Sequence, residues 1–417
     1  MSKTILILDL YSAANRGDAA ILEGLISSLK RQAPDSQFII HTWFPAQVKS
    51  DLGAATRSPL IRQFLGDYRS NIKTVTICSG LMLCSVLARF GLDLYRILPR
   101  RYRESFADFL AADLIVGMGG GFYNDNYWVA LPGRLCHLII GKLLGKFVAI
   151  SAHSFGPFNR KLAQLLAHYV FNWVDVICVR DEASLAILKS LHVADNKVHK
   201  VADSAWLLDS ISKEEANSLL EQQGIDADQP LLVSVSGRIW PYYRLKENNQ
   251  GHQNYVEAVA IVLDFIIEKY HGWVVFLSTC YEDRQVGFEI KQRLQQPDRF
   301  CIASEAYEAK QLKGLYGLMD FHIGTRMHSV ILALSKGTPC IGISYEPKLF
   351  SLMTELELEG FVTDIEAIEA LRVEKMVDKI VKDRQRYQAV IDQKLPELQQ
   401  QAQENARIIA GLLAKPI

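Results

Sequence analysis

The stretch GTRMHS, residues 324 to 329, sets an arginine and a histidine two positions apart between two apolar runs. Arg326 can hold a phosphate or a carboxylate through its planar fork of N–H groups. His328 would open a helix, where its charged form is disfavoured unless an anion binds close by. The pair predicts acid chemistry on an anionic substrate. The structural alternative is an ion pair between Arg326 and an acid such as Glu282 or Asp320.

A second arginine also follows an apolar run that is expected to be a strand. Arg238 comes after LLVSVSG, and Arg326 comes after DFHIG. Ligands of open parallel sheets bind where strand ends turn into helix starts. We therefore expect Arg238 and Arg326 to clamp one small polyanion.

Three turns in the first half of the chain also carry polar residues after apolar runs. In YSAANRGDAAIL, residues 11 to 22, Asp18 is expected to cap a helix, which leaves Asn15 as an amide that binds a hydroxyl. In AISAHSFGPF, residues 149 to 158, His153 is expected to bind substrate or act as a base. A local hydrogen-bonding role is the alternative for His153.

The third turn is DLIVGMGGGFYNDNYW, residues 113 to 128, in which Gly119, Gly120 and Gly121 allow backbone N–H groups to approach an anion or a sugar. Close strand-to-helix packing is the alternative. Asn124 and Asp125, within residues 123 to 127, are expected to face a carbohydrate. The spacing matches neither a Walker A loop nor a dinucleotide fingerprint, so no nucleotide cofactor is indicated.

The elements that must position these residues alternate as short apolar runs and amphipathic helices, the pattern of βαβ units. The pattern stops after about residue 210 and restarts near 230. We predict an α/β protein with two Rossmann-like domains facing a cleft, which is the GT-B architecture. The domains are expected at 1–215 and 225–375, and C-terminal helices at 376–417, broken at Pro396, are expected to pack back across both.

Composition excludes several partners. Forty-six basic and 46 acidic residues give no net field to attract nucleic acid. The seven cysteines form no Cys/His cluster of the kind that zinc needs, and they predict buried thiols in a reducing cytoplasm. The first apolar run is too short for a signal peptide. Residues 74–103 combine an apolar run with arginines, and they predict either a core helix or peripheral contact with the inner face of the cell membrane.

Six motifs together carry a resemblance to a known family. They are NRGD at 15–18, GMGGG at 117–121, VRDEAS at 179–184, VADSAW at 201–206, SGR at 236–238 and GTRMHS at 324–329. In this order they resemble the polysaccharide pyruvyl transferases. The family often has D-P-A where this chain has Asp203-Ser204-Ala205, so the resemblance assigns no role to that loop.

The resemblance implies transfer of the enolpyruvyl unit of phosphoenolpyruvate to two hydroxyls of a sugar, as a ketal. It implies Arg238, Arg326 and His328 as the donor site, and no cofactor besides the donor substrate. The acceptor would be a glycan, either polymeric or a lipid-linked exopolysaccharide precursor. Candidates for the base are Asp18, Asp125 and His153. The alternative function is a GT-B glycosyltransferase with a nucleotide-sugar donor, which KGTPCIGISYEPKLFSL at 336–352 would suit.

Overall fold

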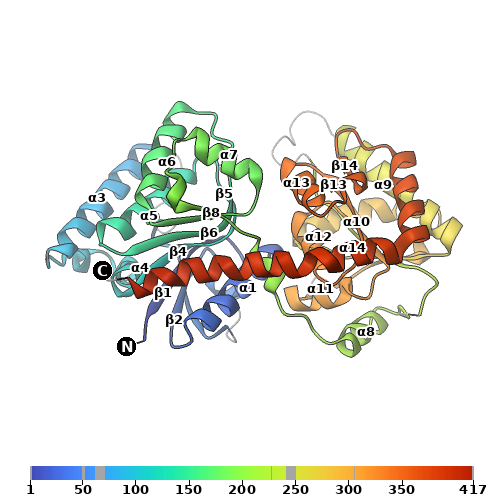
Figure 1. The fold of residues 1–417 in the computed structure, drawn as a ribbon, viewed down its shortest axis with the longest axis horizontal. Coiled ribbons are helices and arrows are strands. Elements are labelled where there is room, and N and C mark those ends of the chain that lie inside the picture. The colour runs from blue at the N-terminus through green and yellow to red at the C-terminus, as the bar shows by residue number, and fades with distance from the viewer. Residues whose placement is uncertain are drawn as a thin grey trace. The chain divides into compact units, whose positions relative to one another are not determined.

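A computed structural model describes residues 2–48, 52–61, 71–126, 128–226, 228–240, 250–304 and 306–415. The chain divides into two compact units. Unit 1 comprises Met1–Ala13, Ile21–Leu207 and Gln399–Ile417, and unit 2 comprises Ala14–Ala20 and Leu208–Leu398. Each unit has its own parallel sheet covered by helices (Figure 1), so the predicted class of two Rossmann-like α/β domains is confirmed.

Unit 1 is built on a parallel sheet in the order β3-β2-β1-β4-β6-β7-β8, with β5 paired to β6. Strand β4 (LIVG) and strand β7 (VICV) are buried at every position, which is typical of parallel sheets covered on both faces. The strands are β1 Thr4–Leu10, β2 Gln37–Thr42, β3 Ala54–Arg57, β4 Leu114–Gly117, β5 Gly120–Tyr123, β6 Phe147–Phe155, β7 Val176–Val179 and β8 Val198–Lys200.

The helices of unit 1 pack their apolar faces on this sheet. Aromatic side chains from α4, β5 and α6, including Phe106, Phe109, Tyr123 and Phe171, are fully buried in its core. The helices are α1 Arg16–Gln32, α3 Asn71–Arg89, α4 Arg100–Ala111, α5 Leu131–Leu143, α6 Lys161–Trp173 and α7 Glu182–Ser190, with short turns η1 Pro45–Gln47, η3 Leu94–Ile97, η4 Asp195–Lys197 and η5 Ser204–Leu207.

Unit 2 repeats the design with a parallel sheet in the order β11-β10-β9-β12-β13-β14. Its strands are β9 Leu232–Ser236, β10 Trp273–Phe276, β11 Phe300–Ile302, β12 Phe321–Gly324, β13 Cys340–Ser344 and β14 Val362–Asp364. Its helices are α8 Lys213–Glu221, α9 Gln250–Tyr270, α10 Arg284–Lys291, α11 Ala309–Tyr316, α12 Met327–Leu334 and α13 Pro347–Glu355, with short turns η6 Tyr281–Asp283, η7 Pro297–Arg299 and η8 Glu359–Phe361.

The C-terminal helix α14 runs over Ala370–Ala410 and is followed by η9 Gly411–Ala414. Its residues up to Leu398 belong to unit 2 and those from Gln399 onward to unit 1. Pro396 lies inside the helix, whereas the backbone leaves helical geometry at Asp383. The expected break at Pro396 is therefore wrong, and the interruption falls thirteen positions earlier.

Both sheets reverse their strand order beside their first strand. In unit 1 the reversal lies between β1 and β4, and in unit 2 it lies between β9 and β12. The carboxyl ends of strands at such a switch point leave a crevice where α/β proteins bind ligands. The residues that follow β1, β4, β9 and β12 are therefore the first places to look for a site.

Candidate functional site

The two arginine turns leave the sheet of unit 2 side by side. Strand β9 pairs with β12 so that Ser236 lies opposite Gly324. Arg238 and Arg326 each follow two positions later in the chain. Because the paired strands are parallel, both arginines emerge at the same edge, at the switch point of the sheet.

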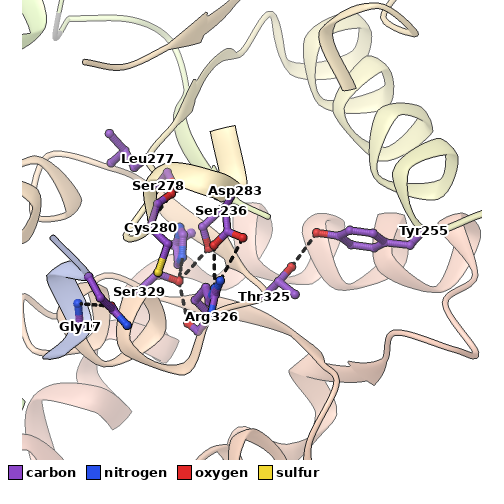
Figure 2. A network of polar contacts seen from close by, with 12 residues as sticks. Gly17, Ser236, Tyr255, Leu277, Ser278, Cys280, Asp283, Thr325, Arg326 and Ser329 are labelled. Atoms are coloured by element: carbon purple, nitrogen blue, oxygen red, sulfur yellow. Dashed lines mark hydrogen bonds and ion pairs between the residues drawn. The ribbon is translucent and has the colours of Figure 1, made fainter. Parts of the chain in front are cut away.

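Arg326 is held in place by a carboxylate that follows strand β10, which pairs with the other side of β9. Its Nε donates to Oδ2 of Asp283 at 2.6 Å and its Nη2 donates to Oδ1 at 3.0 Å. The Asp283 side chain is 2% exposed and that of Arg326 is 18% exposed. Figure 2 shows the two side chains facing each other. The pair uses two of the five N–H groups of the guanidinium, so the others can serve a ligand.

The ion-pair partner of Arg326 is Asp283, and neither Glu282 nor Asp320 takes that place as the sequence suggested. Glu282 is the chain neighbour of Asp283. Asp320 pairs with Arg384 and accepts a hydrogen bond from the backbone N–H of Leu232. Burial works against the charge of Arg326, but Cys280 and Asp283 outweigh it and raise its pKa. Sequence reasoning missed Asp283, although an acid just after the strand beside β9 was a usable signal.

One tyrosine hydroxyl connects the two arginine turns. Tyr255, on α9, is 1% exposed, and its hydroxyl lies 2.9 Å from Oγ1 of Thr325, the residue before Arg326. The same hydroxyl is hydrogen-bonded by the backbone of Arg238. Burial raises the pKa of Tyr255 to about 12, so the hydroxyl stays protonated. Tyr255 therefore fixes the spacing between the two turns.

Arg238 lies against an aromatic side chain. Its guanidinium carbon is 3.9 Å from the ring centroid of Tyr345, and the residue is 7% exposed. Trp240 packs near the same ring, with centroids 5.8 Å apart. A stacked guanidinium is restricted to one plane, which favours bidentate recognition of a planar anion.

The N-terminal turn Ala14–Ala20 belongs to unit 2, where it packs against His328. A Cβ atom at Gly17 would lie 2.5 Å from Nδ1 and 2.9 Å from Cβ of that histidine. The backbone N–H of Arg16 donates to the Thr279 carbonyl at 2.8 Å. The NRGD and GTRMHS motifs, more than 300 residues apart in the chain, thus meet within one unit.

The residue that caps α1 differs from the expected one. Oδ1 of Asn15 accepts the N–H of Gly17 at 3.0 Å, and the Asn15 carbonyl accepts the N–H of Ala19. Asn15 is therefore the residue that caps α1. Asp18 lies inside the first turn of the helix and is 6% exposed. The expectation that Asp18 is the cap is wrong, because the helix starts at Arg16 rather than after Asp18.

The other histidine of the stretch, His322, is buried beneath the site. Its Nδ1 is 2.9 Å from Oγ of Ser234 and its Nε2 is 3.0 Å from Oγ of Ser329. Ser329 in turn lies 2.7 Å from Oγ of Ser236 and donates to the Arg326 carbonyl. Burial lowers the pKa of His322 to about 3, so it stays neutral. His322 is thus a support for the two turns, and His328 alone of the two can act on a ligand.

One cysteine lies close to the arginine turns. Cys280, near Arg326 in Figure 2, has its pKa raised to about 12 by burial, so it stays a thiol at neutral pH. Within the described ranges, no group of three or more histidines, cysteines or acids lies close enough together to hold a metal ion.

The glycine turn of unit 1 serves close packing. A Cβ at Gly119 would lie 3.1 Å from the carbonyl oxygen of Ala152 on β6, and Gly120 has a φ of +150°, which disfavours any side chain. Strand β5 begins at Gly120, so the turn tucks a short extra strand against β6. The packing alternative accounts for Gly119 and Gly120, while Gly121 lies within the strand.

His153 supports this turn from below. It is fully buried on β6, its Nε2 accepts the N–H groups of Phe122 and Tyr123 at 2.8 and 3.2 Å, and its Nδ1 lies 3.1 Å from the Met118 carbonyl. A ring that accepts at Nε2 and donates at Nδ1 is neutral. The expected substrate or base role of His153 is therefore replaced by a structural one, because both ring nitrogens are engaged with backbone groups.

Asp125 and Asn124 are likewise tied to the backbone. Oδ2 of Asp125 accepts the N–H groups of Asn159 and Arg160 at 2.6 and 2.7 Å, just before α6. Nδ2 of Asn124 donates to the Gly121 carbonyl at 2.8 Å, and both side chains are almost fully buried. The expected sugar-facing and base roles of Asp125 are thus replaced by a tie between two loops. Tyr127, at the end of this loop, lies outside the described residues.

Two further motifs of the first half meet through a buried ion pair. Nη1 of Arg180 donates to Oδ2 of Asp203, and both side chains are 4% exposed. Asp181 caps α7 by accepting the Ser184 N–H at 2.8 Å. VRDEAS and VADSAW therefore stabilise the first unit.

A carboxylate that sequence reasoning missed lies at the switch point of unit 1. Asp9, near the end of β1, has a φ of +71°, which is uncommon outside glycine. Its Oδ2 accepts the Tyr123 hydroxyl at 2.6 Å. Burial raises the pKa of Asp9, while nearby Arg134 opposes the shift. A positive φ on a residue other than glycine costs free energy that the surrounding structure must offset. The single Asp inside the run ILILDL was the only signal of this residue in the sequence.

The described geometry supports one kind of chemistry best. Unit 2 presents two arginines at one sheet edge, with a half-buried histidine opening the helix that follows Arg326. Such a set can hold a small anion with two charged groups and deliver a proton to it.

Comparison of the fold with solved structures shows GT-B-like neighbours. UDP-GlcNAc 2-epimerase from Neisseria meningitidis, solved with UDP-GlcNAc, is 12% identical, with a TM-score of 0.62 over 99% of this chain and 100% of that one. Alr3699/HepE of Anabaena, solved with UDP and glucose, is 12% identical, with a TM-score of 0.58 over 99% of both chains. At this identity the likeness establishes the fold alone.

Sequence comparison gives the family. The amylovoran biosynthesis protein AmsJ of Erwinia amylovora is 28% identical over an alignment of 383 positions that covers 87% of this chain and 88% of AmsJ. The sequence model of the polysaccharide pyruvyl transferases matches residues 15–347, a range that begins at the Asn15 turn and extends beyond GTRMHS. The chain is therefore an enzyme of the polysaccharide pyruvyl transferase family.

Proposed function

We propose that this enzyme transfers the enolpyruvyl group of phosphoenolpyruvate to two hydroxyls of a sugar in an exopolysaccharide or in its lipid-linked precursor. The observation that carries the proposal is the meeting of three family motifs in unit 2. SGR and GTRMHS leave neighbouring strands, and the NRGD turn packs against His328.

The donor has a phosphate and a carboxylate on adjacent parts of a small molecule, and two separate arginines suit two separate anions. Arg326, whose direction Asp283 fixes, is the proposed partner of the phosphate. Arg238, restricted by Tyr345, is the proposed partner of the carboxylate. Both remain cationic at neutral pH, so they can also stabilise the phosphate as it leaves.

His328 is the proposed general acid. It protonates C3 of the donor, which makes C2 electrophilic, and a sugar oxygen then forms a bond to C2. The C2–O bond to phosphate breaks, and the second sugar hydroxyl closes the ketal. The two hydroxyls lose two protons, one of which replaces the proton given to C3 while the other leaves with hydrogen phosphate, so atoms and charge balance.

Asp18 is the proposed base for the acceptor hydroxyl. Asp18 lies in the turn that packs against His328, and Asn15 now serves that turn as its cap. The name of AmsJ supports a role in polysaccharide biosynthesis.

The direct test is phosphate release from phosphoenolpyruvate in the presence of a panel of glycans, with the pyruvylated product identified by mass spectrometry. Thermal shift gives a second measurement. Phosphoenolpyruvate should raise the melting temperature and UDP should not. Stabilisation by UDP alone would favour the nucleotide-sugar alternative.

His328→Asn should lower kcat by about 10²-fold or more while donor affinity changes less, because the variant lacks the general acid. The control is His271→Asn, an equal change at an exposed histidine of unit 2 whose positive φ asparagine tolerates. Equal kcat for the two variants would remove His328 from the chemistry.

Arg326→Ala should instead abolish most of the thermal shift given by phosphoenolpyruvate. Arg372→Ala, at an exposed position of α14, is the matched control. A normal donor-induced shift in Arg326→Ala would show that the donor binds elsewhere.

Gly17→Ala tests the contact between the N-terminal turn and the histidine. The new methyl group would overlap the His328 ring and its Cβ, so kcat should fall at least tenfold even though Gly17 has no positive φ. Gly360→Ala, where no atom lies within 4 Å of the new methyl, should keep full activity. Equal activity of the two variants would refute a role for this contact.

A further inference from the structure

The loop after α3 exposes apolar side chains beside arginines. We define the apolar–basic loop as residues 89–103. It has four exposed large hydrophobic residues, and Ile97 is one of the most exposed in the described chain. Their exposed fractions are 76% for Phe90, 56% for Leu92, 44% for Leu94 and 81% for Ile97. A protein surface seldom shows a cluster of this kind without a partner.

The same loop is strongly basic. Residues 89–103 hold five arginines, at 89, 96, 100, 101 and 103, against one acid, Asp93. The Arg96 and Arg100 side chains are 69% and 87% exposed although each has an acidic neighbour. The Arg103 guanidinium donates to the Arg96 carbonyl at 3.3 Å, which ties the end of the loop to its middle.

A second apolar surface lies on the same unit. Helix α6 exposes one stripe at intervals of three and four residues, made of Leu162, Leu165, Tyr169 and Trp173. Helix α5 packs against both α3 and α6, and Figure 1 shows the three helices along one side of the sheet of unit 1. Tyrosine and tryptophan are the residues that favour the boundary between water and lipid.

From these surfaces we infer that unit 1 docks on an anionic lipid bilayer, with the apolar–basic loop inserted among the headgroups. Exposed apolar side chains would enter the acyl boundary while the arginines contact lipid phosphates. Within the described ranges, no helix has the length and apolar character needed to cross a bilayer.

Charge favours a membrane over a second copy of the chain. A two-fold interface brings the same patch of both copies together, so the arginines of one loop would face those of the other. An anionic bilayer has the complementary charge. The inference goes beyond the proposed function, since lipid binding requires neither donor nor sugar.

The test is sedimentation of the full chain with vesicles of phosphatidylcholine alone or with about one-third phosphatidylglycerol. The anionic vesicles should bind the protein at least tenfold better, and added salt should weaken the binding. Arg96→Gln should lower the partition coefficient about fivefold, which corresponds to about 1 kcal/mol per arginine at such a surface. The double variant Phe90→Ser, Ile97→Ser should lower it at least tenfold.

The matched control is Phe288→Ser on α10 of unit 2, an exposed phenylalanine with Arg284 near its ring. It should bind vesicles like the unaltered chain. All variants should keep the thermal shift with phosphoenolpyruvate, which separates this inference from the donor proposal. Equal binding to both kinds of vesicle, no binding to either, or full binding by the double variant would overturn it. So would a dimer in solution that the double variant abolishes.

Discussion

The ion pair between Asp283 and Arg326 allows a sharp prediction about Asp283→Asn. The amide keeps the size of the side chain and one acceptor oxygen, but it removes the negative charge 2.6 Å from Nε of Arg326. Asp283 is 2% exposed, so water cannot replace that charge readily. Removing one partner of a buried pair costs about 3–5 kcal/mol, and the retained hydrogen bond places this variant near the lower figure.

For a domain of roughly 200 residues, about 3 kcal/mol lowers the melting temperature by about 6–12 °C. The assay is differential scanning calorimetry without ligand. The control is Asp378→Asn, which removes one charge from the exposed pair with Lys269, whose side chains are 46% and 42% exposed. Exposed pairs contribute about 0–1 kcal/mol, so this control should shift the transition by no more than about 4 °C.

The donor provides the second half of the test. Without Asp283, a bound phosphate becomes the main countercharge for Arg326. Phosphoenolpyruvate should therefore raise the melting temperature of Asp283→Asn more than that of the unaltered enzyme, while kcat falls because the guanidinium is less well oriented. A melting temperature within about 2 °C of the unaltered enzyme would refute the energetic argument. An unchanged donor shift on a destabilised variant would show that Arg326 does not meet the donor.

Three further predictions concern the supports of the site. Tyr255→Phe removes the hydroxyl bonded to Thr325, so stability should fall by about 1–3 kcal/mol and the KM for the donor should rise. The control is Tyr316→Phe, which removes a buried hydroxyl bonded to the Leu277 carbonyl and should lower stability without changing the KM. His322 has a pKa of about 3 when folded and about 6.5 when unfolded, so the unfolded chain binds the extra proton and stability is lost as pH falls below 6.5. Its contribution should drop by about 2 kcal/mol between pH 7 and pH 5, and a His322→Asn variant with an unchanged acid slope would contradict this. Asp125→Ala should lower stability by about 1–2 kcal/mol, because the N–H groups of Asn159 and Arg160 before α6 lose the carboxylate that accepts them. A change in kcat at constant stability would contradict the structural role.

Much of the architecture follows from the order of residues in the chain. Buried parallel strands are continuous apolar runs such as LIVG and VICV, and helices between them show a 3.6-residue period, so two sheets could be predicted. Arg238 and Arg326 could be predicted as a pair for the same reason, since both follow strands and parallel strands end at one edge.

The individual roles of polar residues at strand ends were harder to predict, because one residue type serves several purposes. A histidine after a strand can face a ligand or bond to the loop above it, and the sequence around His153 does not distinguish these. Capping depends on where the helix starts, and a shift of three positions moved the cap from Asp18 to Asn15. Asp9 escaped notice because its positive φ is a property of the folded backbone.

The sequence by itself determined the fold class, the two arginine turns and the family resemblance, because periodicity and short motifs are local properties. Only the tertiary structure decided that Asp283 holds Arg326, that Tyr255 joins the two turns, and that Gly17 lies against His328. Those contacts join residues between 43 and 311 positions apart. They exist only when strands pair in register and the N-terminal turn packs into unit 2, which no local pattern can specify.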